Sequence, residues 1–138
     1  MVFFGAEIKH FRSNRYIQVR NKLFDLSIPK IMGVLNATPD SFFEGSRVEK
    51  NADLSSRVSA MVNAGMDILD IGGCSTRPGA EEVSEKEELE RVLPLIKKIR
   101  KEFPEILISI DTFRASVAEA ALKVGADIIN DVQGGNYD

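Results

Sequence analysis

The strongest constraint on the fold is an alternation of short apolar runs with amphipathic segments along most of the chain. The apolar runs lack a clean polar alternation and occupy residues 31–35, 67–71, 106–110 and 127–132. Runs of this length suit strands that are buried on both faces, as in a parallel sheet covered by helices. The strand–helix–strand order therefore predicts an α/β protein built from βαβ units.

Three segments between these runs have helical periodicity. The first follows Asn51 and ends at Gly65, where a glycine suits a helix C-terminus. The second has the clearest start, because Ser84 and Glu87 have the S-x-x-E spacing of a capping box. The third follows the run at 106–110 and stops at Gly125. Each predicted helix thus joins one predicted strand to the next.

Two local patterns support this organisation. Residues 64–70 resemble residues 124–130, which indicates that one helix-stop-strand unit is used twice. Before the first buried run, residues 16–19 and 23–26 flank a short polar turn and predict a small hairpin.

Composition indicates one soluble domain. A length of 138 residues suits a single folded unit, and 43% apolar with 28% charged residues excludes a disordered tail. No apolar stretch approaches the roughly 18 residues of a membrane helix. The single cysteine, Cys74, fits a reducing compartment. A net charge of −3 and a pI near 5.3 argue against a nucleic-acid surface. We therefore expect a cytoplasmic protein without a membrane or nucleic-acid partner.

Polar residues stand at the carboxyl end of every predicted strand. They are Asn36, Asp70, Asp111 and the pair Asn130–Asp131. Ligands of parallel α/β folds gather at this end of the strands, where loops and helix N-termini converge. The alternative interpretation is that each residue only caps the following helix. Four such positions in register favour a ligand site.

Two loops that follow predicted strands carry further candidate groups. Residues 36–45 combine turn formers with two aromatic side chains, which suggests a flat apolar substrate, or else a loop that folds back on the sheet. Residues 72–79 combine glycines, hydroxyl groups and one arginine, which are groups that hold a phosphate. The pattern is neither a P-loop nor a dinucleotide motif. No pair of His or Cys residues has the spacing of a zinc site.

At these residues the sequence closely resembles the dihydropteroate synthases of folate biosynthesis. The likeness runs from about Leu23 to the end, in four motifs that keep the order of that family: residues 32–42, 70–80, 109–112 and 129–131. The resemblance implies a TIM (β/α)8 barrel, of which this chain would contain about the first four strands and three helices. It also implies a transferase that condenses 6-hydroxymethyl-7,8-dihydropterin pyrophosphate with para-aminobenzoate, is the target of sulfonamides, and releases pyrophosphate.

The same resemblance implies roles for individual residues at the pterin and the anion. Asp111 and Asn130 would form hydrogen bonds with the edge of the pterin ring, and Val132 would pack on that ring. Asn36 would bind the pyrophosphate together with a magnesium ion, and so would be the metal-binding residue. Asn36 and Asp111 are two of the three predicted catalytic residues.

The remaining implied roles fall in the two loops. Thr76 and Arg77 would bind the anion, and Arg77 is the third predicted catalytic residue. Phe42 and Pro78 would border the aminobenzoate. Cys74 stands where the family usually has Glu, and we expect it to serve as a small side chain.

The resemblance covers only part of a barrel, since a TIM barrel takes about 250 residues. We expect residues 1–138 to be the N-terminal half of a single pterin-binding barrel domain, with residues 1–28 as an N-terminal extension that contains the hairpin. The later Lys, the Arg-x-His pair and a further Asp of the family are absent from this sequence. We therefore expect a fragment, or a chain that pairs with a complementary half, which is inactive alone. The full-length enzyme would be a homodimer.

Two alternatives stay open at this point. The pterin-binding domain of corrinoid methyltransferases shares the Asp and Asn at the pterin edge, although the loops at 36–45 and 72–79 favour the synthase. The chain could also be a catalytically silent pterin-binding module or a self-associating half-barrel.

Overall fold

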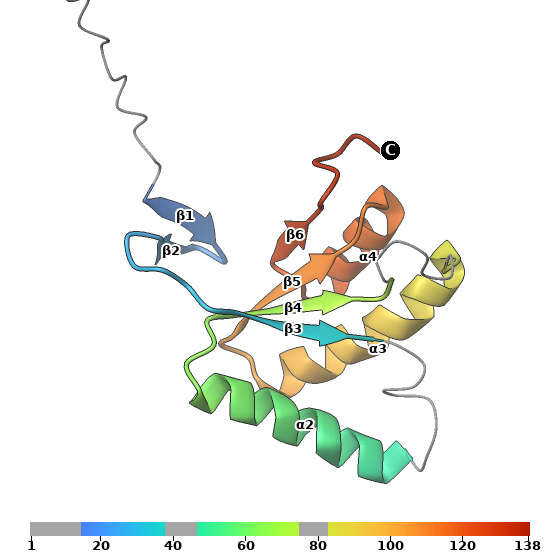
Figure 1. Cartoon of the computed structure of the whole chain (residues 1–138), viewed down its shortest axis with the longest axis horizontal. Helices are drawn as coiled ribbons and strands as arrows, with labels where there is room; N and C mark the ends of the chain where they lie inside the picture. Colours follow the sequence, from blue (N-terminus) through green and yellow to red (C-terminus); the bar gives the residue numbers. More distant parts are fainter. Residues whose placement is uncertain (1–14, 38–46, 75–82) are drawn as a thin grey trace, which may run out of the picture.

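The computed structural model of the chain describes residues 15–37, 47–74 and 83–138. Short strands alternate with longer helices over most of this length (Figure 1). The elements are, in chain order, β1 (Tyr16–Val19), β2 (Lys22–Asp25), β3 (Met32–Asn36), α2 (Arg47–Asn63), β4 (Ile68–Gly72), α3 (Glu85–Glu102), β5 (Leu107–Asp111), α4 (Ala115–Val124) and β6 (Ile128–Asn130).

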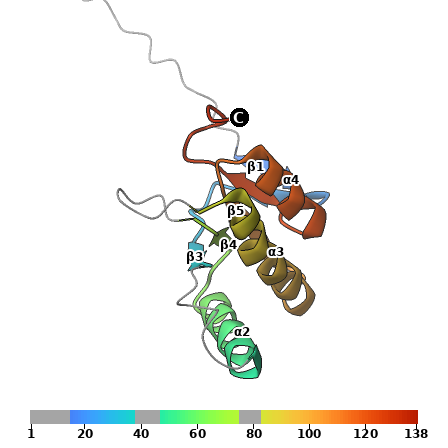
Figure 2. The same cartoon turned by 90° about the vertical axis from the view of Figure 1, so that its right-hand side faces the viewer.

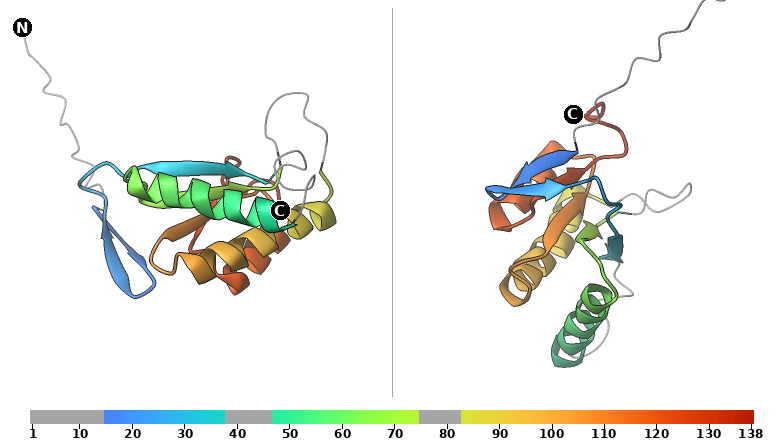
Figure 3. Two further views of the ribbon diagram at one scale, coloured as in Figure 1. Left: turned by 90° about the horizontal axis from the view of Figure 1, so that it is seen from below. Right: turned by 90° about the vertical axis from the view of Figure 1, so that its left-hand side faces the viewer.

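The last four strands form one parallel sheet in the order β3-β4-β5-β6, so each strand pairs with the next one along the chain. The helices α2, α3 and α4 connect these strands and gather on one side of the sheet (Figures 2 and 3). The predicted α/β class is confirmed, and the arrangement is the first part of a (β/α)8 barrel.

The core lies between the sheet and the helices. Alternate strand residues face the helices, and all of those on β4 and β5 are apolar and fully buried: Leu69, Ile71, Ile108 and Ile110. They belong to one cluster with Val58 of α2, Val92 and Ile96 of α3 and Val117 of α4. Burial of each such side chain stabilises the fold by about 1.5–3 kcal/mol. The apolar spacing that predicted the helices is therefore the spacing of their buried face.

The opposite face of the sheet differs from the prediction of strands buried on both sides. Every residue of β4 is buried, but on β3 the side chains of Met32 and Val34 are 42% and 57% exposed. The prediction is wrong for β3, and also for β6, where Ile129 is 47% exposed. Each of these strands has a neighbour on only one side within the described residues. The open face of the sheet thus has exposed apolar side chains at Met32 and Val34 of β3.

The helix ends mostly agree with the sequence signals. The Ser84 side chain accepts a hydrogen bond from the Glu87 N–H at 3.3 Å, as the capping box predicts. Helix α2 begins at Arg47, four residues before the predicted start at Asn51. The predicted stop at Gly125 is confirmed by its left-handed conformation, with φ of 118°.

The repeated helix-stop-strand unit is also present in three dimensions. Gly65 and Gly125 both have positive φ, of 94° and 118°, which suits a residue without a Cβ. Two residues later, Asp67 and Asp127 each accept a backbone hydrogen bond from the preceding strand region, from Ile31 N–H at 2.9 Å and Ile108 N–H at 2.8 Å. Each aspartate thus fixes the start of its own strand against its neighbour.

The predicted hairpin is confirmed, with its second strand shifted by one residue to Lys22–Asp25. The turn consists of Arg20 and Asn21, which both have positive φ, of 49° and 61°. Such a two-residue turn matches the twist of the flanking strands and pairs Val19 with Lys22. The hairpin lies at the amino end of the sheet (Figure 1). There Arg20 donates to the carbonyl of Pro104 at 2.7 Å.

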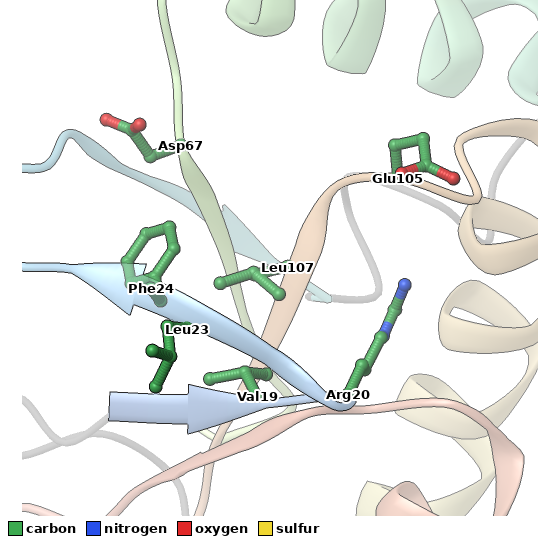
Figure 4. A pocket seen from close by; sticks show the side chains of 7 residues that line it. All are labelled: Val19, Arg20, Leu23, Phe24, Asp67, Glu105 and Leu107. Carbon is green, nitrogen blue, oxygen red and sulfur yellow. The ribbon is translucent and has the colours of Figure 1, made fainter. Parts of the chain in front are cut away.

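A pocket of about 360 Å³ opens at this amino end, between the hairpin and the sheet (Figure 4). It is lined by Val19, Arg20, Leu23, Phe24, Asp67, Glu105 and Leu107. Its cation Arg20 is paired with Asp127, and its carboxylate Asp67 accepts from Ile31 N–H and Lys30. Arg20 and Asp67 therefore already make contacts that stabilise the fold.

Candidate functional site

The strand-end residues predicted from the sequence form one row across the sheet. The strand register aligns Asn36 with Gly72, Gly72 with Asp111, and Asp111 with Asn130. Register partners of parallel strands lie on the same face, here the face opposite the helices. We call these residues the upper row. The expectation that polar groups of separate strands meet at the carboxyl end is confirmed for Asn36, Asp111 and Asn130.

Gly72 leaves room at the centre of the upper row. A Cβ atom on this glycine would lie 3.5 Å from Asp111 Oδ2 and 3.8 Å from Asn36 Oδ1. The amide of Asn36 and the carboxylate of Asp111 therefore approach the same point from either side. The sheet presents oxygen atoms around a space that a side chain would otherwise fill.

A second polar row lies directly below. The register aligns Val34, Asp70, Ser109 and Ile128, which we call the lower row. Asp70 accepts a hydrogen bond from Asn130 Nδ2 at 3.1 Å and so links the two rows. Asp70 Oδ1 and Ser109 Oγ are buried without a hydrogen-bond partner among the described residues. The centre of the sheet thus contains polar groups whose hydrogen-bonding capacity the described fold does not use.

The electrostatics of the upper row favour a ligand that donates hydrogen bonds. The pKa of Asp111 is raised, first by burial and then by the negative charges of Asp70, Glu88 and Asp131. An ionised carboxylate in such surroundings is stabilised by N–H donors or by positive charge. The edge of a nitrogen heterocycle that carries amino and ring N–H groups meets this requirement.

The alternative interpretation, in which each strand-end residue only caps the following helix, can be examined at Asp131 and Asp111. Asp131 accepts from the backbone N–H groups of Gln133 at 2.8 Å and Gly135 at 2.5 Å, so it stabilises a turn. Asp111 does not cap α4, because the N-cap residue is Arg114, which makes no side-chain capping bond. Capping therefore does not explain the presence of Asp111.

The other predicted site residues are further from the two rows or are not described. Val132 follows β6 and is 67% exposed. Thr76, Arg77, Pro78 and Phe42 lie outside the described residues, so their predicted contacts with anion and aminobenzoate stay predictions.

A buried ion pair lies beside the end of β4. Among the acidic residues at the start of α3, which would be expected to face solvent, Glu88 is fully buried and pairs with Arg114. Arg114 also donates to the carbonyl of Val83 at 2.8 Å and to Cys74 Sγ at 3.4 Å. Glu88 lies four residues before Val92 on the buried face of α3, and this spacing is the signal that could have revealed it.

This pair also affects the cysteine. Burial, and then the charge of Glu88, raise the pKa of Cys74 to about 11. The thiol therefore stays protonated near neutral pH, and a protonated thiol is a poor nucleophile. This agrees with the expectation that Cys74 serves as a small side chain.

A metal ion at the upper row would need oxygen atoms of a bound ligand or of water in addition to the protein groups described there. Within residues 15–37, 47–74 and 83–138, no three His, Cys, Asp or Glu side chains come together as a metal site. The amide oxygen of Asn36, which is exposed and close to the Asp111 carboxylate, is a hard oxygen donor. It fits an ion such as Mg²⁺, which is usually held by few protein groups together with water and phosphate oxygens.

No helix in the described part of the chain is long and apolar enough to span a membrane.

Comparison with known proteins gives consistent matches. Residues 32–138 match the family described as pterin binding enzyme. The dihydropteroate synthase of Staphylococcus haemolyticus is 49% identical over 109 residues, which are 79% of this chain and 40% of the relative. The crystal structure of 7,8-dihydropteroate synthase from Vibrio fischeri ES114 is 48% identical, with a TM-score of 0.75 over 88% of this chain and 43% of that one.

A third match is the dihydropteroate synthase of Xanthomonas albilineans, solved with 4-aminobenzoic acid. It is 38% identical, with a TM-score of 0.76 over 89% of this chain and 45% of that chain. The chain thus spans less than half the length of the relatives that it matches here.

Proposed function

This chain belongs to the pterin-binding enzyme family, and from that premise we propose that it carries part of the active site of a dihydropteroate synthase. The observation that carries the proposal is the upper row, in which Asn36, Asp111 and Asn130 meet around Gly72 at the carboxyl ends of the strands. The pterin would lie against this row.

Each polar group of the row has a chemical task in this proposal. The Asp111 carboxylate accepts from the ring N–H or amino group of the pterin, and the raised pKa of this residue marks a site that such donors stabilise. The amide of Asn130 forms a second hydrogen bond to the pterin edge. Together they fix the ring in its plane.

In the proposed reaction the amine nitrogen of para-aminobenzoate attacks the methylene carbon of the dihydropterin pyrophosphate. The C–N bond forms, the C–O bond to pyrophosphate breaks, and the amine loses a proton. No protein nucleophile is needed, which agrees with the raised pKa of Cys74. The chain contributes by orienting the substrates and binding the leaving group.

Asn36 would bind the pyrophosphate and its magnesium ion, and such an ion neutralises charge that develops on the leaving oxygen. The predicted contacts of Thr76 and Arg77 with the same anion belong to this proposal. So do the contacts of Phe42 and Pro78 with para-aminobenzoate, a ligand that the Xanthomonas albilineans structure contains. The homodimer and the cytoplasmic location also stay predictions.

Release of pyrophosphate tests the proposal. The chain is incubated with dihydropterin pyrophosphate, para-aminobenzoate and magnesium, and a chain extended to the length of the relatives is assayed in parallel. We expect the 138 residues to bind a pterin without turnover, and the extended chain to release pyrophosphate only when para-aminobenzoate is present. Pterin binding without pyrophosphate release by either chain would contradict the synthase and favour a silent pterin-binding module.

A further inference from the structure

Asp70 lies in the lower row, and its side chain is almost completely buried, at 4% exposure. Its one hydrogen bond from a described residue comes from Nδ2 of Asn130, at 3.1 Å. The two residues come from β4 and β6, which are separated by β5 in the sheet. A contact across an intervening strand is possible because the residue of β5 in the lower row, Ser109, is small.

The chemistry of this contact determines which way the Asn130 amide faces. An ionised carboxylate has only acceptor atoms, so the group that points to Asp70 must be the NH2 of the amide. The amide oxygen Oδ1 then points away from Asp70. Within the described residues this oxygen receives no hydrogen bond, and it belongs to a residue of the upper row. An amide without such a partner could rotate by half a turn at little steric cost, because its oxygen and nitrogen have nearly equal size.

We propose that Asp70 is a positioning residue that fixes the Asn130 amide with its oxygen, and not its NH2, toward the ligand. This inference rests on the proposed function, since it takes the pterin edge as the ligand of the upper row. With Asp111 and the Asn130 oxygen both accepting, the site selects a ring edge that carries donors. A ring with a carbonyl oxygen in place of the pterin amino group is then disfavoured, because two acceptors face each other.

Two ligands distinguish a site that selects a donor-bearing ring edge from a site that does not. Pterin carries an amino group at ring position 2, and lumazine carries an oxygen at the same position on an otherwise matching bicycle. Their affinities for the wild-type chain and for variants are measured by the change in ligand fluorescence. We expect wild type to prefer pterin. In Asp70→Asn the new amide can donate to Oδ1 of Asn130, and the preference should fall by about tenfold, the value of one hydrogen bond.

A swapped pair distinguishes positioning from general damage to the fold. The double variant Asp70→Asn/Asn130→Asp has the same net charge as wild type and nearly the same side-chain volumes. Its amide at position 70 donates to the carboxylate at position 130, which still presents an acceptor to the ligand. We expect the double variant to recover the preference for pterin that Asp70→Asn has lost. Ser109→Ala, which alters the same lower row without changing the Asn130 contact, should keep the preference.

The outcomes are distinct. Equal weakening of pterin and lumazine in Asp70→Asn, with no recovery in the swapped pair, would show that Asp70 only supports the fold. Lumazine binding as tight as pterin binding in wild type would overturn the inference while leaving a pterin-type site in place. Failure of wild type to bind either ligand would overturn the proposed function and this inference with it. Circular dichroism of each variant confirms that the comparison is made on folded protein.

Discussion

At the amino end of the sheet, the carboxylate of Asp127 accepts from several partners, whereas at the carboxyl end Asp70 and Asp111 have acceptor capacity that no described residue uses. Asp127 accepts from Arg20, from Arg100 at 2.7 Å and from the Ile108 N–H at 2.8 Å. At the other end, Asp70 has one partner and one buried oxygen without any described partner. The pKa of Asp111 is raised, because the residue is partly buried and because negative groups lie around it.

Structural and functional carboxylates of one sheet thus differ in how many of their acceptor positions are occupied. A carboxylate whose acceptors are all used contributes to stability, and a further ligand gains nothing from it. A half-buried carboxylate with unused acceptors costs stability until a donor arrives. In barrels of this kind ligands bind at the carboxyl ends of the strands, while the opposite end serves stability. The pocket at the amino end (Figure 4) therefore belongs to the structural end.

The largest effect is expected at the amino end. Asp127→Asn leaves Arg20 and Arg100 without their counter-charge, and the Asp127 side chain is only 5% exposed. We expect the free energy of unfolding in urea to fall by about 3 kcal/mol, as for a broken buried ion pair. Glu119→Gln, which breaks an exposed pair with Lys123, is the matched control and should change nothing measurable. Equal changes in the free energy of unfolding for the two substitutions would contradict a structural role of Asp127 at the amino end.

Two neighbouring glycines at the end of β4 are expected to differ in their effects on stability and on ligand binding. A Cβ on Gly73 would lie 2.8 Å from both Glu88 Cγ and Val92 Cγ1, which is too close, whereas a Cβ on Gly72 meets only ordinary contacts. We expect Gly73→Ala to lower the free energy of unfolding by about 1–3 kcal/mol through overpacking. Gly72→Ala should leave stability nearly unchanged and weaken pterin binding severalfold, because the methyl group fills the space between Asn36 and Asp111. A larger loss of stability in Gly72→Ala than in Gly73→Ala, measured by thermal unfolding, would contradict the claim that the space at Gly72 is kept open for a ligand.

A smaller effect is expected from the unpartnered hydroxyl of the lower row. Ser109 Oγ is buried without a hydrogen-bond partner among the described residues. Ser109→Ala removes a desolvated polar atom, so we expect the free energy of unfolding to rise by up to about 1 kcal/mol. Ser55→Ala, at a hydroxyl that donates to Glu102 at 2.6 Å, provides the opposite case and should not stabilise. A clear loss of stability in Ser109→Ala would show that this hydroxyl has a structural partner.

The smallest effect concerns the pH dependence of stability. Because the pKa of Asp111 is raised above 3.8 in the folded chain, the folded state holds this proton more tightly than the unfolded state. The contribution of this residue to stability therefore falls as the pH rises from 3.8 to the folded pKa, and the full loss is present above the folded pKa. We expect Asp111→Asn to be modestly more stable than wild type at pH 7 in urea unfolding. This advantage should vanish as the pH falls below the ordinary value of 3.8.

Much of the fold could be predicted from the sequence because its signals are local. The capping box at Ser84, the stop at Gly125 and the apolar runs each depend on neighbours within a few residues, and each appears in the structure. The exposure of Val34 could not be predicted in this way. The exposure of Val34 depends on which strands flank β3. The sequence pattern of an apolar strand is the same whether its face is covered or open, so the pattern cannot distinguish the two.

The candidate site likewise has some features that the sequence predicts and others that it does not. The meeting of Asn36, Asp111 and Asn130 follows from a general rule about strand ends, so sequence order was enough to predict it. The contact of Asp70 with Asn130 and the pair of Glu88 with Arg114 join residues 60 and 26 positions apart. Such pairs depend on strand register and on the rotation of a helix about its axis, which composition and periodicity do not specify.

A bound pterin can be located on the sheet by amide N–H correlation spectra of the labelled chain. During titration with 6-hydroxymethylpterin, we expect the chemical-shift changes to concentrate at Gly72, Asp111 and Asn130. We expect the amides of Asp67 and Asp127, at the opposite end, to stay unchanged. Shifts that concentrate at Asp67 and Asp127 would contradict the claim that ligands bind at the carboxyl end, and a spectrum without shifts would contradict pterin binding itself.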